Sequence, residues 1–415
     1  MKSELFAKKN NFDNTGLSDA ILTCSVILLV VAVLFSFLFP ETMVAASLSY
    51  ILVTYELIVS AYLIYSNRGL LLIDYEGIVA IVYIITCFYF TTIHAGLVNS
   101  VTAVFKEYII IFVCVFLKCR TYSFKGFKRN LNIVILFACL ALIVSVINDN
   151  MINTVIHITN VYEADIHSIY SNKNQFGRLL YLAAVCSFFM YIISSRKVNR
   201  RFYFLITGIF SLATVITFSR TSLLALGVFF AFYYLFNLKG NLFKHFILIV
   251  SIVIVVFIIL SNDALYDYII TFIVRKEVGI DERSGIWMAG INYISKHPLV
   301  GAGEYMAENI IHAAGMHIDE FHNEYIYRMV ASGIPVALLY LGIIIERFIT
   351  IINNRKNNPV MNCSIAMLIS LLAYMFFEQY SIFQFSATGI VVIMFLYIAP
   401  NIKEFNKENY LNDKQ

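Results

Sequence analysis

The chain has 415 residues, of which 60% are hydrophobic and only 13% are charged. Because a soluble domain carries about 25% charged residues, this composition excludes an ordinary soluble globular protein and indicates a polytopic membrane protein. The formal net charge is only +4, so the positions of the charges are more informative than their sum.

The apolar runs predict an all-α polytopic integral membrane protein with about 12 transmembrane helices in a single domain, 1–415. A span needs roughly 20 helical residues to cross a hydrocarbon layer about 30 Å thick. Pro335 lies inside the tenth run and is expected to kink that helix. In chain order the runs are Ala20 to Phe39, Met43 to Tyr65, Gly77 to Val98, Val101 to Leu117, Leu131 to Ile147, Phe176 to Ile193, Phe202 to Phe218, Ser222 to Phe236, Phe246 to Leu260, Met329 to Ile345, Val360 to Phe377 and Ile382 to Ala399.

The basic residues predict the orientation of these spans. Most of the 30 lysines and arginines fall in alternate loops on the same side as the N-terminus. Since basic residues favour cytoplasmic loops, both termini are expected in the cytoplasm. The basic residues expected on the outer side or within the membrane are Lys106, Lys173, Arg178, Arg220, Arg275, Lys276, Arg283, Lys296 and Arg328.

The largest polar segment, 261–328, is expected to be an outward loop that rests on the helix bundle and carries the chemistry. Within it, "DERSGIWMAGINYISKHP" predicts a helix that Asp281 or Ser284 caps and that ends before His297 and Pro298. Trp287, Ile291 and Ile294 fall on one face of this helix, as in an interfacial amphipathic helix.

Two residues of this helix have alternative interpretations. Trp287, the only tryptophan, either anchors the helix at the membrane interface or stacks on a sugar ring. Arg283 is either a solvated charge or a group that turns toward the bundle.

The histidines and cysteines do not form a metal-binding pattern. His312, His317 and His322 are five residues apart, a spacing that does not place them on one helical face, and no HExxH pattern is present. The seven cysteines contain no CxxC pair and avoid the long polar loops, so neither a disulfide nor a metal site is expected. No cofactor motif is found, and the short basic loops predict no nucleic-acid partner.

Two charged positions near the predicted membrane boundary remain open between a structural and a functional role. His322 is either a hydrogen-bonded boundary residue or a general base, since histidine titrates near neutral pH. Lys106 lies inside the fourth run, where it either forms an interhelical ion pair or reaches a substrate. Its neighbour Glu107 faces another side of the helix, so the two are not expected to pair.

Four stretches in order resemble the O-antigen ligase and polymerase superfamily of bacterial membrane glycosyltransferases, which have a GT-C-like helical fold. They are "SNKNQFGRLL", "FSRTSLLAL", "RSGIWMAGINYISKHPLVGAG" and "FHNEYIYRMVASGIP", within about residues 170 to 345. The resemblance implies catalytic roles for Arg220, Arg283 and His322 and needs no cofactor or metal. It also implies contacts to the substrate from Lys106 and Glu378, and Lys173, Arg178, Arg328 and Trp287 are further candidates.

The resemblance predicts a polysaccharide polymerase that uses an undecaprenyl-diphosphate-linked oligosaccharide at the outer face of the bacterial inner membrane. Two guanidinium groups would bind the diphosphate, and an imidazole would take the proton of the acceptor hydroxyl. Such an enzyme is expected to work with a flippase and a chain-length regulator. The alternatives are a ligase that transfers the glycan to lipid A core, or a transporter of lipid-linked oligosaccharide, which would show internal repeats and broken helices.

Overall fold

The computed structural model describes residues 15–38, 43–66, 73–149, 151, 166–170, 172–237, 280–304, 306–354, 359–383 and 386–402. Every regular element within these ranges is helical, and a single isolated bridge joins Tyr122 to Ile402. The predicted all-α polytopic membrane fold is therefore confirmed.

The helices follow the predicted runs, and several extend beyond them by a turn or more. Their bounds are α2 (Thr15–Leu38), α3 (Met43–Ser66), α4 (Tyr75–Ala95), α5 (Leu97–Ile111) with the π-helical continuation η2 (Phe112–Leu117), α6 (Phe124–Asn148), α8 (Lys173–Ile193), α9 (Lys197–Ile216), α10 (Arg220–Asn237), α13 (Ile280–Lys296), α14 (Ala307–Ala313), α15 (Glu324–Ser332), α16 (Ile334–Asn353), α17 (Pro359–Phe377) and α18 (Ala387–Ile393) with η3 (Met394–Ile398) and η4 (Ala399–Asn401).

Eight of the described helices are long and apolar enough to cross a membrane. Two shorter apolar helices, Tyr50–Ser66 and Ala387–Asn401, coincide with the second and twelfth predicted runs. The seventh run corresponds to α9, which is not among these eight, and the ninth run, 246–260, lies outside the described residues, so the predicted number of twelve spans stays a prediction.

The tenth predicted run is two helices rather than one kinked helix. Gly333 lies between α15 and α16 with a φ of +78°, a conformation that side chains other than that of glycine rarely adopt. Pro335 then falls in the first turn of α16, where its fixed φ and missing N–H are tolerated. The spanning helix therefore begins at Ile334, whereas the apolar run had placed its start at Met329.

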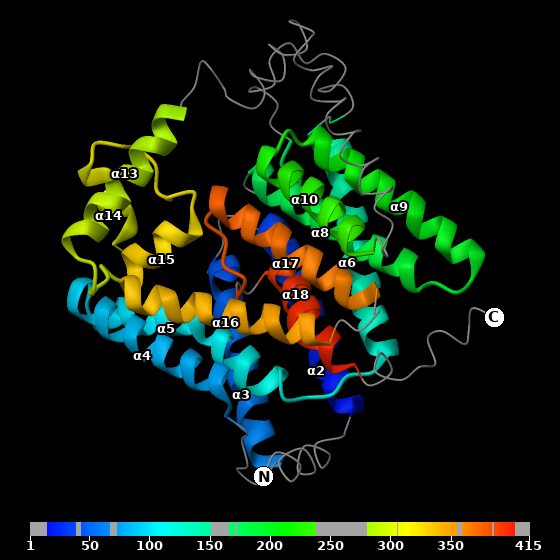
Figure 1. Ribbon diagram of the computed structural model, residues 1–415, viewed down its shortest axis with the longest axis horizontal. Coiled ribbons are helices and arrows are strands. Elements are labelled where there is room, and N and C mark those ends of the chain that lie inside the picture. The colour runs from blue at the N-terminus through cyan, green and yellow to red at the C-terminus, as the bar shows by residue number, and fades with distance from the viewer. Residues whose placement is uncertain are drawn as a thin grey trace, which may run out of the picture.

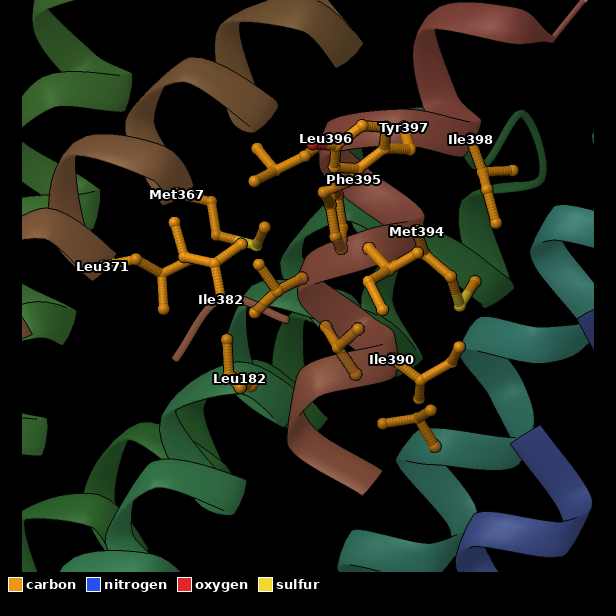
Figure 2. Close-up of a cluster of buried hydrophobic side chains, with 14 of the residues drawn as sticks. Leu182, Met367, Leu371, Ile382, Ile390, Met394, Phe395, Leu396, Tyr397 and Ile398 are labelled. Atoms are coloured by element: carbon orange, nitrogen blue, oxygen red, sulfur yellow. The ribbon is translucent and has the colours of Figure 1, made fainter. Parts of the chain in front are cut away.

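The centre of the bundle is formed by α8, α17 and α18 (Figure 1). Among the eight candidate spans, α8 and α17 are the most buried, at 83% and 72% of their apolar windows. Figure 2 shows Leu182 of α8, Met367 of α17 and Ile390 of α18 in one cluster of buried apolar side chains. These helices are apolar on all sides, as expected for helices surrounded by others.

Residues 280–332, here called the α13–α15 unit, form a small separate core at one end of the bundle (Figure 1). The α13–α15 unit also packs on α4 and α17, so the segment lies against the bundle. Its buried side chains are Ile286, Ala302, Ile311, Phe321, Ile326 and Val330.

The opposite end of the bundle is held by a second set of charges. Glu76, in the first turn of α4, is buried between Arg347 of α16 and Lys118, which follows η2. Both cations were predicted to lie on the cytoplasmic side. Since α17 starts at this end and Glu378 follows its last residue, Glu378 lies at the other end, together with the α13–α15 unit.

Candidate active site

The carboxylate of Glu378, directly after α17, is contacted by side chains from four other segments. Its Oε1 accepts hydrogen bonds from Nδ2 of Asn174 at 2.9 Å, Oγ1 of Thr221 at 3.1 Å and Nη2 of Arg283 at 3.3 Å. Its Oε2 lies 3.5 Å from Nδ1 of His322. We call Glu378 and these four residues the Glu378 cluster.

His322 of the Glu378 cluster has a strained backbone and an incompletely bonded ring. Its φ is +48°, which is uncommon for a residue other than glycine, and such conformations concentrate at functional sites. The Nδ1 atom is buried without an aligned hydrogen bond, although the side chain is 26% exposed. The imidazole therefore borders solvent on one side and a carboxylate on the other.

One asparagine of each of the two motifs "SNKN" and "HN" has a structural role as a helix cap. Asn172 accepts a hydrogen bond from the backbone N–H of Gln175 at the start of α8. Asn323 does the same for the N–H of Ile326 at the start of α15. These caps fix where α8 and α15 begin, and hence where Asn174 and His322 lie.

The "SRT" motif brings α10 into the Glu378 cluster through the residues on either side of its arginine. Thr221 donates to Glu378, and Ser219 donates to Oδ1 of Asn174 at 3.1 Å. Arg220, half-buried, begins α10 between them, and Phe218 just before has a φ of +54°. The structure thus brings the backbone of Arg220 to the same end of the bundle as Arg283 and His322.

Arg178 is buried beside the Glu378 cluster, one turn along α8 from Asn174. Its guanidinium lies 4.1 Å from the ring centroid of Tyr380 and 5.9 Å from that of Tyr374, so it is held by cation–π contacts. The Nε atom of Arg178 and the hydroxyl of Tyr380 have no hydrogen-bond partner among the described residues. Lys173, the first residue of α8, is half-buried at the same end.

Trp287 attaches α13 to the rest of the molecule. Its Nε1 donates to the backbone carbonyl of Phe321 at 2.9 Å, and its ring packs edge-on against Phe376 of α17 at 5.6 Å. Of the face predicted for this helix, Ile291 is 49% exposed and Ile286 is buried in its place. Trp287 and Ile294 pack against the core of the α13–α15 unit, and the interfacial role of the predicted face stays a prediction.

The predicted ends of α13 are partly right. The helix stops at Lys296, immediately before His297, as expected. It is already helical at Ile280, so both predicted caps, Asp281 and Ser284, lie inside the helix rather than before its first residue. Arg283 therefore projects from the first turn of α13.

Arg328, another candidate, contacts carboxylates away from the Glu378 cluster. Its Nε donates to Glu324 at 2.7 Å, and its Nη1 lies 3.0 Å from Glu107 and 3.3 Å from Glu304. Burial raises the pKa of the Glu324 carboxyl, and the positive charge of Arg328 opposes that rise. The side chain of Lys106 lies outside the described side chains, so its predicted contact is not observed.

Several polar contacts could not be predicted from the sequence. Asn174 and Thr221 lie inside recognised motifs, but nothing in the sequence indicated that both bond to Glu378. Glu56 of α3 is buried, with an Oε1 atom that has no partner among the described residues. A single carboxylate within the run 43–65 was the available signal for it.

Among the described residues, no other histidine joins the Glu378 cluster. His312 pairs through Nε2 with Asp319 at 3.1 Å, on an exposed part of the α13–α15 unit. Within the part of the chain that the structure describes, no three His, Cys, Asp or Glu side chains are grouped as metal ligands.

Comparison with known proteins finds a family model that matches part of the chain. Residues 203–341 match the family model described as O-antigen ligase. This segment includes Arg220, Arg283 and His322, whereas Glu378 and Arg178 lie outside it. No curated protein matches the chain. This segment is similar to the O-antigen ligase family, and the match supports the O-antigen ligase and polymerase superfamily, whose members are associated with glycosyltransferase activity.

Proposed function

We propose that the protein is a bacterial cell-surface polysaccharide polymerase, of O-antigen or capsule type. It transfers a growing glycan from undecaprenyl diphosphate to a lipid-linked repeat unit. The observation that carries this proposal is the Glu378 cluster, which joins an arginine and a histidine at one end of a membrane bundle. A lipid-linked donor presents its diphosphate at such a boundary.

Two arginines are assigned to the diphosphate. Guanidinium groups bind phosphate oxygens in charge-assisted pairs and stabilise the charge that develops as the diphosphate leaves. The side chain of Arg283 is 30% exposed, so it can exchange the carboxylate of Glu378 for a substrate oxygen. Arg220, half-buried at the start of α10, supplies the second cation.

His322 is assigned as the general base. The acceptor hydroxyl oxygen attacks the anomeric carbon of the donor sugar, and its proton passes to the imidazole. The bond from the anomeric carbon to the diphosphate oxygen breaks, and undecaprenyl diphosphate leaves with both electrons. By resemblance to the ligases, the configuration at the anomeric carbon inverts. Glu378, 3.5 Å from Nδ1, orients the ring and stabilises the protonated imidazole.

The remaining candidates are assigned to the glycan or the diphosphate. Arg178 and Lys173 lie at the start of α8 beside Asn174, and Lys106 belongs to α5. The distribution of basic residues supports an inner-membrane protein with both termini in the cytoplasm and the Glu378 cluster on the outer face. A flippase and a chain-length regulator are the protein partners that such a reaction requires.

A ligase that transfers the finished glycan to lipid A core is the second candidate, because the matched family model carries that description. We favour the polymerase because it occurs in bacteria with or without an outer membrane. The two enzymes leave different products when they are absent.

Deletion of the gene tests this choice. A polymerase deletion leaves single repeat units on the cell surface, whereas a ligase deletion accumulates long lipid-linked chains. Purified protein that lengthens isolated lipid-linked repeat units without other components would exclude a pure transporter. If alanine at Arg220, Arg283 and His322 left chain length unchanged, the assigned chemistry would be wrong.

A further inference from the structure

Arg328 has partners on four different segments and is almost completely buried. Its side chain is 4% exposed, and its carboxylate partners are Glu107 of α5, Glu304 of the loop before α14 and Glu324 of α15. The Nη1 atom also donates to the hydroxyl of Tyr83 of α4. We call these five residues the Arg328 cluster.

The shape of the guanidinium group decides how these partners are held. Nε binds the carboxylate of Glu324 within α15, while Nη1 points to Glu107 and Glu304 outside it. A planar fork holds separate partners in fixed directions, which a lysine ammonium does not do. The ring centroid of Tyr340 of α16 lies 4.9 Å from Cζ of Arg328, so this ring covers one face of the guanidinium.

Glu107 and Glu304, the two carboxylate partners outside α15, both help to hold the α13–α15 unit against the bundle. Glu304 also accepts a hydrogen bond from Tyr327, and its backbone N–H donates to Thr91 of α4 at 3.4 Å. Removing a partner from a buried charge pair is costly because an unpaired charge remains. Arg328 therefore sets where the beginning of α15 lies against α4 and α5.

The start of α15 is also where His322 is held. Glu324, bound by Arg328, is two residues after His322. On the other side, the N–H of Phe321 donates to Oε1 of Gln379 at 3.2 Å, and its carbonyl accepts from Trp287. A residue with a φ of +48° keeps that conformation only where its surroundings determine it strongly.

We propose that Arg328 is a positioning residue for glycan transfer, which fixes the general base His322 through Glu324 and the start of α15. This inference rests on the proposed function. Among the described residues, no hydrogen bond or ion pair joins Arg328 to Glu378 or His322, and its donors are directed mainly to carboxylates. It acts on the reaction through α15 and does not bind the diphosphate.

The test compares Arg328→Gln, Arg328→Lys and Glu324→Gln with a control at the other end of the bundle. Arg347→Gln is matched, since Arg347 is also 4% exposed and also binds a glutamate of the bundle through Nε. The substrate is the lipid-linked glycan extracted from cells that lack the protein. Turnover is normalised to the protein that elutes as a folded species in detergent.

A small displacement of a catalytic group lowers the rate at the reacting centre, so we expect the two Arg328 variants to lose kcat by about tenfold or more. Their KM should change by less than about twofold, because uniform binding of the substrate is kept. Glu324→Gln keeps an acceptor for Nε and should show a smaller loss of kcat in a well-folded protein. Arg347→Gln should keep the wild-type kcat per folded molecule.

Three results would overturn the inference. They are wild-type kcat in Arg328→Lys, wild-type kcat in Glu324→Gln, and an equal loss of kcat in Arg347→Gln. His322→Ala, assayed in parallel, separates this inference from the proposed function. If His322→Ala is active, the assignment of the base is wrong; if it is inactive while the Arg328 variants are normal, only the positioning role is wrong.

Discussion

Nδ1 of His322 lies 3.5 Å from Oε2 of Glu378, although the two residues belong to different parts of the chain. His322 ends the loop before α15, and Glu378 follows the last residue of α17. A carboxylate beside an imidazole fixes the ring orientation and stabilises the ring once it takes a proton. This pairing makes Glu378 the first residue to test.

Replacing Glu378 by glutamine keeps its shape and hydrogen-bonding capacity but removes its charge. We expect Glu378→Gln to lower kcat by at least about tenfold, since orientation and charge stabilisation of the general base are both weakened. The measurement is the rate of chain extension by purified protein on isolated lipid-linked repeat units. Glu346→Gln on α16 is the control and should be as active as the wild type. Wild-type activity in Glu378→Gln would show that the carboxylate does not assist His322.

Arg283 is predicted to need its guanidinium shape as well as its charge. Arg283→Lys keeps a cation but loses the fork that binds two phosphate oxygens. We expect kcat/KM to fall by about tenfold for lysine and by about a hundredfold for alanine, as when a charge-stabilising donor is removed. Lys296→Ala, at the exposed end of the same helix, should have no effect. Equal activity of the lysine variant and the wild type would argue against contact with the diphosphate.

The membrane helices could be predicted because each requires a long apolar run. Apart from the tenth, the runs that lie in the described residues are helices with small shifts at their ends. The break at Gly333 could not be predicted from apolar content, which continues from Met329 to Ile345. It depends on the backbone conformation of Gly333 and on the place of Pro335 in the first turn of α16.

Residues of the candidate site could be predicted where they lie in recognised motifs. Their partners could not be predicted where contacts between distant segments determine them. The order of the motifs selected Arg283 and His322, which the structure brings to Glu378. Nothing local in the sequence of Arg328 reveals that Glu107, 221 residues earlier, is its partner. A buried ion pair between distant segments leaves no periodic signal, so the sequence alone indicates Arg328 only as an outward arginine and a candidate substrate contact.

Trp287 gives a way to separate a packing role from sugar stacking. Trp287→Phe keeps an aromatic ring against Phe376 but loses the hydrogen bond to Phe321. We expect a loss of stability of about 1 kcal/mol, the usual contribution of one hydrogen bond, and a lower kcat because Phe321 precedes His322. Thermal unfolding and steady-state kinetics measure both effects, with Met288→Leu on the exposed side as the control. A large rise in KM with unchanged Tm would instead indicate a stacked sugar.

Arg178 tests whether the buried region beside Glu378 binds substrate. Its Nε lacks a partner in the described part of the chain, and a ligand oxygen would satisfy it. We expect Arg178→Gln to raise KM for the lipid-linked donor by about tenfold with a smaller change in kcat, the pattern of lost uniform binding. Arg201→Gln, exposed near the start of α9, should leave both constants unchanged. A fall in kcat with an unchanged KM would show that Arg178 does not contribute to binding of the donor before the reaction.

Gly301 tests whether close packing of the α13–α15 unit is required for activity. A Cβ atom there would lie 2.1 Å from the backbone carbonyl oxygen of Ala331, so Gly301→Ala must displace the loop from α15. Overpacking of this kind costs about 1–3 kcal/mol, and the displaced loop carries Glu304 of the Arg328 cluster. Gly227→Ala is the matched control, since its Cβ meets nothing within 4 Å in α10.

Trp287, the only tryptophan, reports unfolding of this unit by fluorescence. We expect a lower transition temperature and lower kcat for Gly301→Ala only; equal transitions in both variants would show that the loop has room to move without affecting His322.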